Sequence, residues 1–593
     1  MTILQSLAAY YDRLSAKGEV ADEGYMPVPI SFVVEIDLDG SFVALVDIRN
    51  PSKNRLVAQQ RVVPKLRDHN NSVDPFLFWD STRYALGATA KEMRRGSASQ
   101  LFDSFRERHE VCLNDSQDEG LRALLRFLRQ WRPEEFEGRG LNNEALDTNI
   151  VFRLHRSPSD DPEREIHLRQ AARAIWNSRV EEDTSEGTCL ATGERAALAR
   201  LHPSFRLLGE KDSAPVVSFN ELAFDSYEKA QGENAPVSKR VAFSYGTALN
   251  KLLKDPGRRV RVGDATAVFW ADASDLGEQR AAAAESFFGT ALNPDDKDAD
   301  QLDAGRMRAA MEAISKGRAA EINPDLDPRT RMHVLGLCLP NPGRTAVRFW
   351  HVGTLGDLAA NLAQHWRDLE IDPNPFKRAP AAWALLYETA LQRKAENIPP
   401  KIGGDLMRAV LDGGRYPLTL LTAVIGRIRA DGDANGIRAA ICKAVIQRNL
   451  RLSKLTEDIP VALDKENVNP AYRLGRLFAL YEWAETGAEK RNATIRDKFF
   501  ASASSTPARV FPLLMRGSTH NLSKLRKGSS VGLAVMLDKE ITDVLGGLSD
   551  QLPASLPLEE QGRFVVGYYH QMQMRYRGKA PEKATENTDE QEE

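Results

Sequence analysis

Strand-like spacing of apolar residues is confined to the first two-thirds of this chain of 593 residues, and that limit restricts the folds available to it. Before about Pro373, runs such as 28–36 and 42–48 have an apolar residue at every second position, which is typical of strands. Asp39-Gly40 lies between these two runs and predicts a tight hairpin turn. After Pro373 the alternation stops, and apolar residues recur at helical spacing.

We therefore expect an α+β protein. A large mixed N-terminal region with antiparallel β-hairpins and helices precedes an all-α C-terminal region that ends in a helical bundle, because its last helical segments are joined by short connections. The tail is rich in Lys, Glu and Thr and is expected to be disordered. The predicted domains are a mixed region at 1–375, a helical connecting region at 376–458, the bundle at 459–577 and the tail at 578–593.

Composition gives no overall sign of nucleic-acid binding. Lys and Arg total 80 against 83 Asp and Glu, so any cationic surface must be local. The four cysteines are far apart and form no CxxC pair, which is typical of a reduced, cytoplasmic protein. We expect no signal peptide at the N-terminus and no contact with a membrane, because no apolar run is long enough to span a bilayer.

Local catalytic motifs are absent from the sequence. It has no phosphate-binding P-loop, HExxH zinc helix or GxSxG nucleophile elbow. The stretch 189–193, Cys-Leu-Ala-Thr-Gly, resembles half of a zinc knuckle, but the other half does not occur. We expect a tight turn with a buried Cys189 and a packed His202, and neither a metal nor a cofactor. A metal-dependent nuclease with scattered carboxylates remains an alternative, as does a helical adaptor that binds proteins alone, with residues 567–570 on its partner face.

One segment, 490–528, concentrates positive charge and has a single acidic residue, Asp497. Small polar residues lie between the cations, and such groups suit phosphate contacts. Phe499 and Phe500 could stack on the bases of a single strand. The alternative is a solvated face balanced by the acidic tail. The nine cations are Lys490, Arg491, Arg496, Lys498, Arg509, Arg516, Lys524, Arg526 and Lys527.

A second candidate for nucleic-acid contact follows a predicted strand that ends at Pro64. Asparagine side chains can donate to and accept from base edges, whereas lysine and arginine can hold phosphates. The alternative is an ordinary polar surface loop. The candidate residues are Lys65, Arg67, His69, Asn70 and Asn71.

Strings of residues that run in order from one end of the chain to the other resemble one known family. The most distinctive is 469–479, Asn-Pro-Ala-Tyr-Arg-Leu-Gly-Arg-Leu-Phe-Ala. These strings are similar to those of the large subunit of type I-C CRISPR surveillance complexes. The other strings lie within 3–11, 149–153, 189–194, 201–204, 217–238, 347–352, 502–507 and 561–571.

The resemblance implies a subunit that binds nucleic acid and performs no chemistry. In RNA-guided recognition the guide pairs with the target strand, while protein reads a short flanking motif and holds the displaced strand. The implied partners are a crRNA-containing complex with backbone, 5′-end processing and small subunits, target double-stranded DNA, and a helicase-nuclease recruited after R-loop formation. The family also implies an internal translation start, here near 459–463, that would yield a separate small subunit.

The resemblance also suggests residue roles. Lys65, Asn70 and Asn71 are expected at the flanking duplex, and Arg67 is expected to bind DNA. After Ser204 the family tends to carry a Gly- and Ser-rich loop, but 205–213 has a single glycine here. Arg206 or Lys211 could replace that loop's contact electrostatically. The residues expected along the displaced strand are Arg491, Arg496, Lys498, Lys524, Arg526 and Lys527.

Overall fold

The computed structural model describes most of the chain and confirms the α+β class. Contacts divide it into two units, one made of Met1–Ser204 and Val217–Leu249, the other of Phe205–Val216 and Asn250–Glu593. The boundaries expected from the sequence stay predictions. The description omits residues 53–54, 66–73, 91–96, 156–160, 162, 182–184, 220, 293–300, 342, 377–379, 490–492 and 578–593.

The first unit contains a four-stranded mixed sheet in the order β3-β2-β8-β7. Strand β2 (Phe32–Ile36) pairs antiparallel with β3 (Phe42–Asp47) and parallel with β8 (Asn149–Leu154). Gly40 adopts a φ of 86° in the turn between β2 and β3, which confirms the predicted hairpin. Strand β7 (Trp79–Ser81) pairs antiparallel with β8.

The two faces of this sheet are covered differently. Phe32, Val34 and Ile36 on one face belong to the core that includes buried residues of α3 (Ala98–Leu113) and α4 (Glu119–Gln130). On the other face, alternate residues of β2, β7 and β8 pack with a two-stranded ribbon. That ribbon consists of β1 (Tyr25–Ile30) and β6 (Gln59–Pro64).

Residues 28–30 therefore do not belong to the hairpin strand that their alternation suggested. Ser31 separates β1 from β2, and β1 pairs with β6 instead. Periodicity cannot show such a break, because both strands keep the same alternation. The remaining elements up to residue 254 are α1 (Ile3–Ala16), β4 (Asn50–Ser52), β5 (Arg55–Val57), α2 (Thr82–Ala85), α5 (Glu135–Gly138), α6 (Gln170–Glu181), β9 (Glu186–Thr188), β10 (Arg195–Ala197), β11 (Ser204–Phe205), β12 (Ala214–Pro215) and α7 (Lys239–Lys254).

The second unit contains an antiparallel sheet in the order β13-β14-β15-β16. The apolar runs 333–339 and 346–352 predict two paired strands, and the pairing of the long strands β15 and β16 confirms them. The apolar run 260–270 predicts a single strand, but it forms two, since the chain reverses at Gly263 with a φ of 62°. The elements are β13 (Arg259–Val262), β14 (Ala265–Ala271), α8 (Glu278–Leu292), α9 (Gln301–Ser315), β15 (Arg331–Asn341), β16 (Arg344–Thr354) and α10 (Leu355–Asp368).

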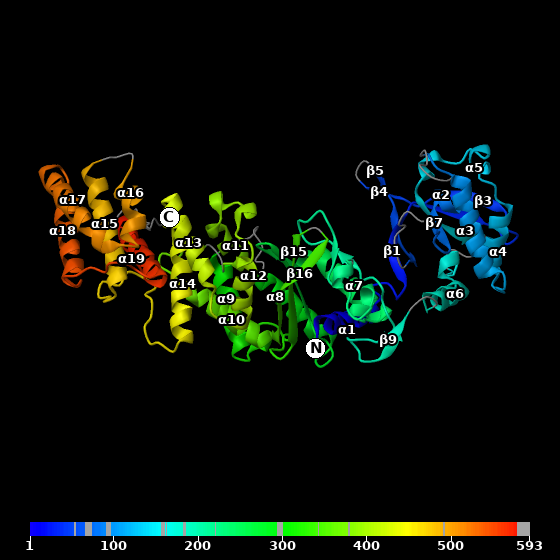
Figure 1. Cartoon of the computed structure of the whole chain (residues 1–593), viewed down its shortest axis with the longest axis horizontal. Helices are drawn as coiled ribbons and strands as arrows, with labels where there is room; N and C mark the ends of the chain where they lie inside the picture. The colour runs from blue at the N-terminus through cyan, green and yellow to red at the C-terminus, as the bar shows by residue number, and fades with distance from the viewer. Residues whose placement is uncertain are drawn as a thin grey trace, which may run out of the picture. The chain divides into compact units, whose positions relative to one another are not determined.

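Among the described residues after 368, all regular elements are helical (Figure 1). Helical spacing predicts one helix at 381–394, but this prediction is wrong beyond Leu386, because short 3₁₀ turns follow and Gln392 and Arg393 adopt positive φ angles. A helix not expected from the sequence, α16, starts at Ile495. The bounds are α11 (Ala382–Leu386), α12 (Ile402–Asp412), α13 (Leu418–Asp431), α14 (Gly436–Leu452), α15 (Pro470–Ala488), α16 (Ile495–Ala503), α17 (Pro507–Lys527), α18 (Val531–Gly546) and α19 (Leu558–Arg577).

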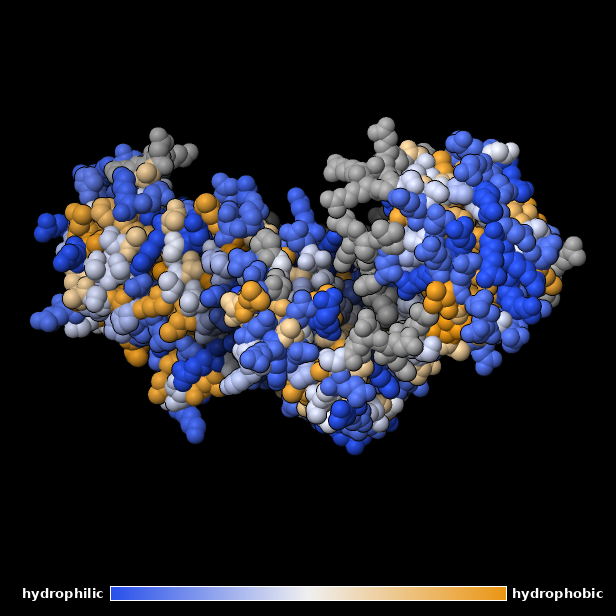
Figure 2. Space-filling view, turned by 45° about the vertical axis from the view of Figure 1, so that its right-hand side comes forward, coloured by the Kyte–Doolittle hydropathy of each residue, from blue (hydrophilic) through white to orange (hydrophobic). Residues whose placement is uncertain are grey.

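Helices α15 to α19 form the expected C-terminal bundle, with α15 in contact with each of the other four. Its core includes Phe478, Phe500 and Phe564, whose rings contact one another. Apolar groups also reach the surface of these helices, as the left side of Figure 2 shows, and Leu513 and Val535 are exposed. Within the described residues, no helix has the length and apolarity required to cross a bilayer.

Candidate nucleic-acid interface

Helix α17 presents two different faces. Pro507 starts the helix, where its missing N–H costs no hydrogen bond. One face is buried in the bundle core, and its residues recur at helical spacing. They are Val510, Phe511, Leu514, Leu522 and Leu525.

The opposite face carries exposed cations. Arg509, Arg516 and Lys527 are separated by seven and eleven residues, and both spacings return to the same side of an α-helix. We call these three residues the α17 stripe. At 1.5 Å per residue it is about 27 Å long. Within the described part of the chain, none of the three forms an ion pair, and exposed His520 lies between them.

The six cations expected along the displaced strand differ in their surroundings. Lys524 forms an ion pair with Glu489 at 3.3 Å, and Arg526 forms one with Asp538 at 2.7 Å. Lys527 is exposed and belongs to the stripe, and Lys498 is exposed on α16. Arg491 lies outside the described residues.

Arg496 has a structural partner inside the bundle. Its guanidinium lies 3.7 Å from the buried carboxylate of Glu482, which also accepts a hydrogen bond from Tyr568 at 2.6 Å. Burial disfavours the charged form of Arg496, but neighbouring Tyr568 and the charge of Glu482 outweigh it and raise the pKa of Arg496. Arg496 therefore compensates a buried carboxylate.

The expectation that Phe500 could stack on a base is wrong. Its side chain is 4% exposed and packs in the bundle core. Phe499 is partly buried against the same core. Sequence reasoning grouped the two rings with the neighbouring cations, but it assigned no role to Arg509 and Arg516. Their seven-residue spacing was the signal that could have identified them.

In the first unit, Lys65 follows directly on strand β6. Its backbone N–H donates to the carbonyl of Gly24 at 2.8 Å, and its ammonium lies 5.7 Å from the ring centre of Phe76. That ring stacks on Trp79 at 4.5 Å. The start of the predicted loop is thus anchored on an aromatic pair. Arg67, Asn70 and Asn71 lie outside the described residues.

Arg206 and Lys211, the two cations expected to replace a glycine-rich contact, are both exposed. Buried Phe205 and Leu207 flank Arg206, so alternation turns its side chain outward. The single glycine of this segment, Gly209, has a φ of 83°.

The half-knuckle at 189–193 is a tight turn, as expected. Gly193 adopts a φ of 76° and donates to the carbonyl of Cys189 at 2.8 Å. Burial would raise the pKa of the Cys189 thiol, but hydrogen bonds led by that of Ser238 lower it to about 7. His202 packs against Tyr245, with Nδ1 2.7 Å from the hydroxyl. Among the residues described, no group of three or more His, Cys, Asp or Glu could hold a metal ion.

Comparison with protein-family models finds one family that matches nearly the whole chain. Residues 7–576 match the family described as CRISPR-associated protein (Cas_Csd1). A search of curated proteins found no match. The family match extends across both units and confirms the resemblance to type I-C large subunits. The chain therefore belongs to the Cas_Csd1 family of CRISPR-associated proteins.

Proposed function

We propose that the chain is the non-catalytic large subunit of a type I-C crRNA-guided complex. In this role it recognises the motif that flanks the target in double-stranded DNA, stabilises the R-loop and recruits the helicase-nuclease. Its other partners are the crRNA and the backbone, 5′-end processing and small subunits. Membership of the Cas_Csd1 family supports a place in a CRISPR complex. The α17 stripe is the observation that supports the DNA-binding role.

The stripe suits a phosphate backbone because its cations form no ion pair with any residue that the structure describes. Lys524 and Arg526 on the same helix already face carboxylates, whereas Arg509, Arg516 and Lys527 face solvent. A phosphodiester strand along the exposed face would exchange bound counterions for these three cations. Such contacts hold a strand without reading its sequence, as the displaced strand requires.

The flanking-motif role is assigned to the segment that begins at Lys65. The aromatic pair under Lys65 fixes the point where this segment leaves the sheet. In the second unit, exposed Arg206 and Lys211 are separate candidates for contact with DNA.

Neutralising the stripe should weaken binding and reduce its salt dependence. For the triple variant Arg509→Gln, Arg516→Gln, Lys527→Gln, we expect the slope of log affinity against log salt to fall by about 2, since each single-strand phosphate contact contributes about 0.7. Affinity for single-stranded DNA at low salt should fall about ten-fold or more. Fluorescence anisotropy with the full chain at several salt concentrations measures both quantities.

The matched control is Lys524→Gln with Arg526→Gln on the same helix. Both cations already face carboxylates, so this double variant should change the slope by less than the stripe variant does. Equal effects of the two variants, or an unchanged slope in the stripe variant, would contradict the proposed role. Incubation of DNA with the chain and magnesium or manganese tests the absence of catalysis, because cleavage abolished by a single carboxylate change would favour a nuclease.

A further inference from the structure

A cleft in the second unit combines two arginines with two aromatic rings. Its volume is about 340 Å³. Arg259 and Arg261 come from β13, the edge strand of the sheet, whereas Trp383 comes from α11 and Tyr387 from the turn that follows. The helical segment thus places its aromatic residues beside a cationic strand edge.

The arginines of this cleft are not neutralised by nearby acids. Arg259 donates to the carbonyl of Leu253, and Arg261 Nε donates to that of Gly263 at 3.3 Å. Within the described part of the chain, neither forms an ion pair, and the described residues that line the cleft include no carboxylate. An anionic group in the cleft would therefore meet two guanidinium groups with donors to offer.

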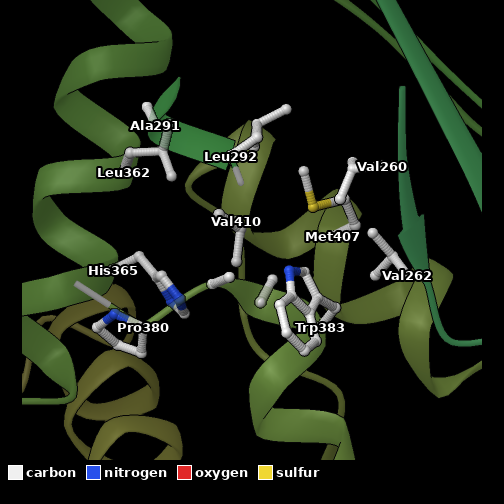
Figure 3. Close-up of a pocket in the computed structure, with 12 residues that line it drawn as sticks. Val260, Val262, Ala291, Leu292, Leu362, His365, Pro380, Trp383, Met407 and Val410 are labelled. Carbon is white, nitrogen blue, oxygen red and sulfur yellow. The ribbon is translucent and has the colours of Figure 1, made fainter. Parts of the chain in front are cut away.

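Trp383 is held from the side opposite to the cleft. With Val260 it lines both the cleft and a smaller apolar cavity, so these two residues form a wall between them. Figure 3 shows the indole ring beside Val262 and Met407 in that cavity. Tyr387 meets the indole edge to face, at 5.9 Å between ring centres and 82° between planes. The aromatic surface is therefore positioned before any ligand arrives.

The loop 205–213 contributes to the same cleft. Leu208 lines it, and the neighbouring Gly209 leaves room for Arg261, because a Cβ at this position would lie 2.3 Å from Nη1. A side chain here would displace the guanidinium. The resemblance predicted several glycines in this segment, and the chain has one. The absence of a side chain at Gly209 leaves the space that Arg261 occupies.

We infer that this cleft binds one unstacked nucleotide, with its base against Trp383 and Tyr387 and its phosphate on Arg259 and Arg261. Aromatic rings stack on any base, and guanidinium groups pair with phosphate. The shared ligand chemistry is that of a nucleoside monophosphate. That a nucleic-acid strand supplies it rests on the proposed function, whereas a free nucleotide offers the same groups without a strand.

Photocrosslinking locates the nucleotide directly. The full chain is irradiated with single-stranded DNA that contains 5-iodouracil, and crosslinked peptides are identified by mass spectrometry. We expect crosslinks at Trp383 or Tyr387. Trp383→Leu should abolish them and weaken binding about ten-fold, as expected for one stacked base. Arg261→Gln should lower the salt slope by about 0.7. The control Arg318→Gln, an exposed arginine of the same unit paired with Glu321, should change neither quantity.

Equilibrium dialysis with uridine 5′-monophosphate separates the two sources of the ligand. Strand binding with crosslinks elsewhere, and with normal behaviour of Arg261→Gln, would overturn the cleft and leave the proposed function intact. Binding of the free nucleotide that Arg261→Gln abolishes, without any strand binding, would support the cleft and contradict the proposed function. Binding of neither probe would overturn both.

Discussion

Replacing Asp368 by alanine should lower the free energy of unfolding of the second unit by about 3–5 kcal/mol, the usual cost of removing one partner of a buried ion pair. Asp368 ends α10 and is 1% exposed. Its carboxylate accepts from Arg448 Nε at 2.7 Å and from Arg451 Nη1 at 2.6 Å, both on α14. Arg448 is fully buried, so the variant would leave its charge without this counterion in a dry core.

The pH dependence of this stabilisation follows from the pKa of Asp368. Burial alone would raise that pKa, but the hydrogen bond from Arg451 and the charge of Arg448 outweigh it, and the pKa is lowered. A carboxylate with a lowered folded-state pKa stabilises the fold above its unfolded pKa and loses this effect as the pH falls through the folded value. The stabilities of the wild type and of Asp368→Ala should therefore converge below about pH 4.

Urea unfolding followed by far-UV circular dichroism, at neutral pH and at about pH 3, measures both effects. The matched control is Asp405→Ala, which removes an exposed ion pair with Arg408 at 3.7 Å. Its effect should stay within about 0.5 kcal/mol. A loss for Asp368→Ala no larger than that of the control would show that Arg448 is satisfied without this carboxylate.

Arg448, Arg438 and Arg476 show where sequence reasoning reached its limit. Apolar periodicity predicted the helices that carry them and the bundle at the C-terminus. It could not show that the three arginines are buried, because their partners Asp368, Glu388 and Gln571 lie far away in the sequence. A count of charged residues cannot distinguish these buried arginines from exposed ones.

The same limit applies to the candidate interface. The segment 490–528 was predicted correctly as cationic, but Arg496 faces a buried glutamate and Lys524 a surface one. The structure shows that α17 buries its opposite face, so Arg509 and Arg516 lie on the exposed face and become candidates for strand contact. The cleft at Arg261 could not be predicted, since its residues come from a strand, a loop and a helix separated by up to about two hundred residues.

Helices α15 and α19 approach each other closely, so side chains added between them should clash and destabilise the bundle. A Cβ on Gly475 of α15 would lie 2.0 Å from the carbonyl oxygen of Phe564, and one on Gly567 of α19 would lie 2.1 Å from that of Tyr472. Both obstacles are backbone atoms of the facing helix, so they cannot move without separating the helices. The two glycines therefore set the distance between α15 and α19 from both sides.

The double variant Gly475→Ala, Gly567→Ala should lose about 3 kcal/mol or more of stability, at or beyond the upper end for overpacked cores. The matched control is Gly517→Ala on exposed helix α17, where a Cβ would meet no atom within 4 Å. That change should raise stability by about 0.5–1 kcal/mol, because alanine favours a helix more than glycine does. Thermal unfolding of the wild type and the two variants measures both the loss and the gain of stability.

Because the α17 stripe depends on the bundle, the double variant should also lose affinity for single-stranded DNA, whereas Gly517→Ala should retain it. A double variant as stable as the wild type would mean that the helices do not approach each other this closely.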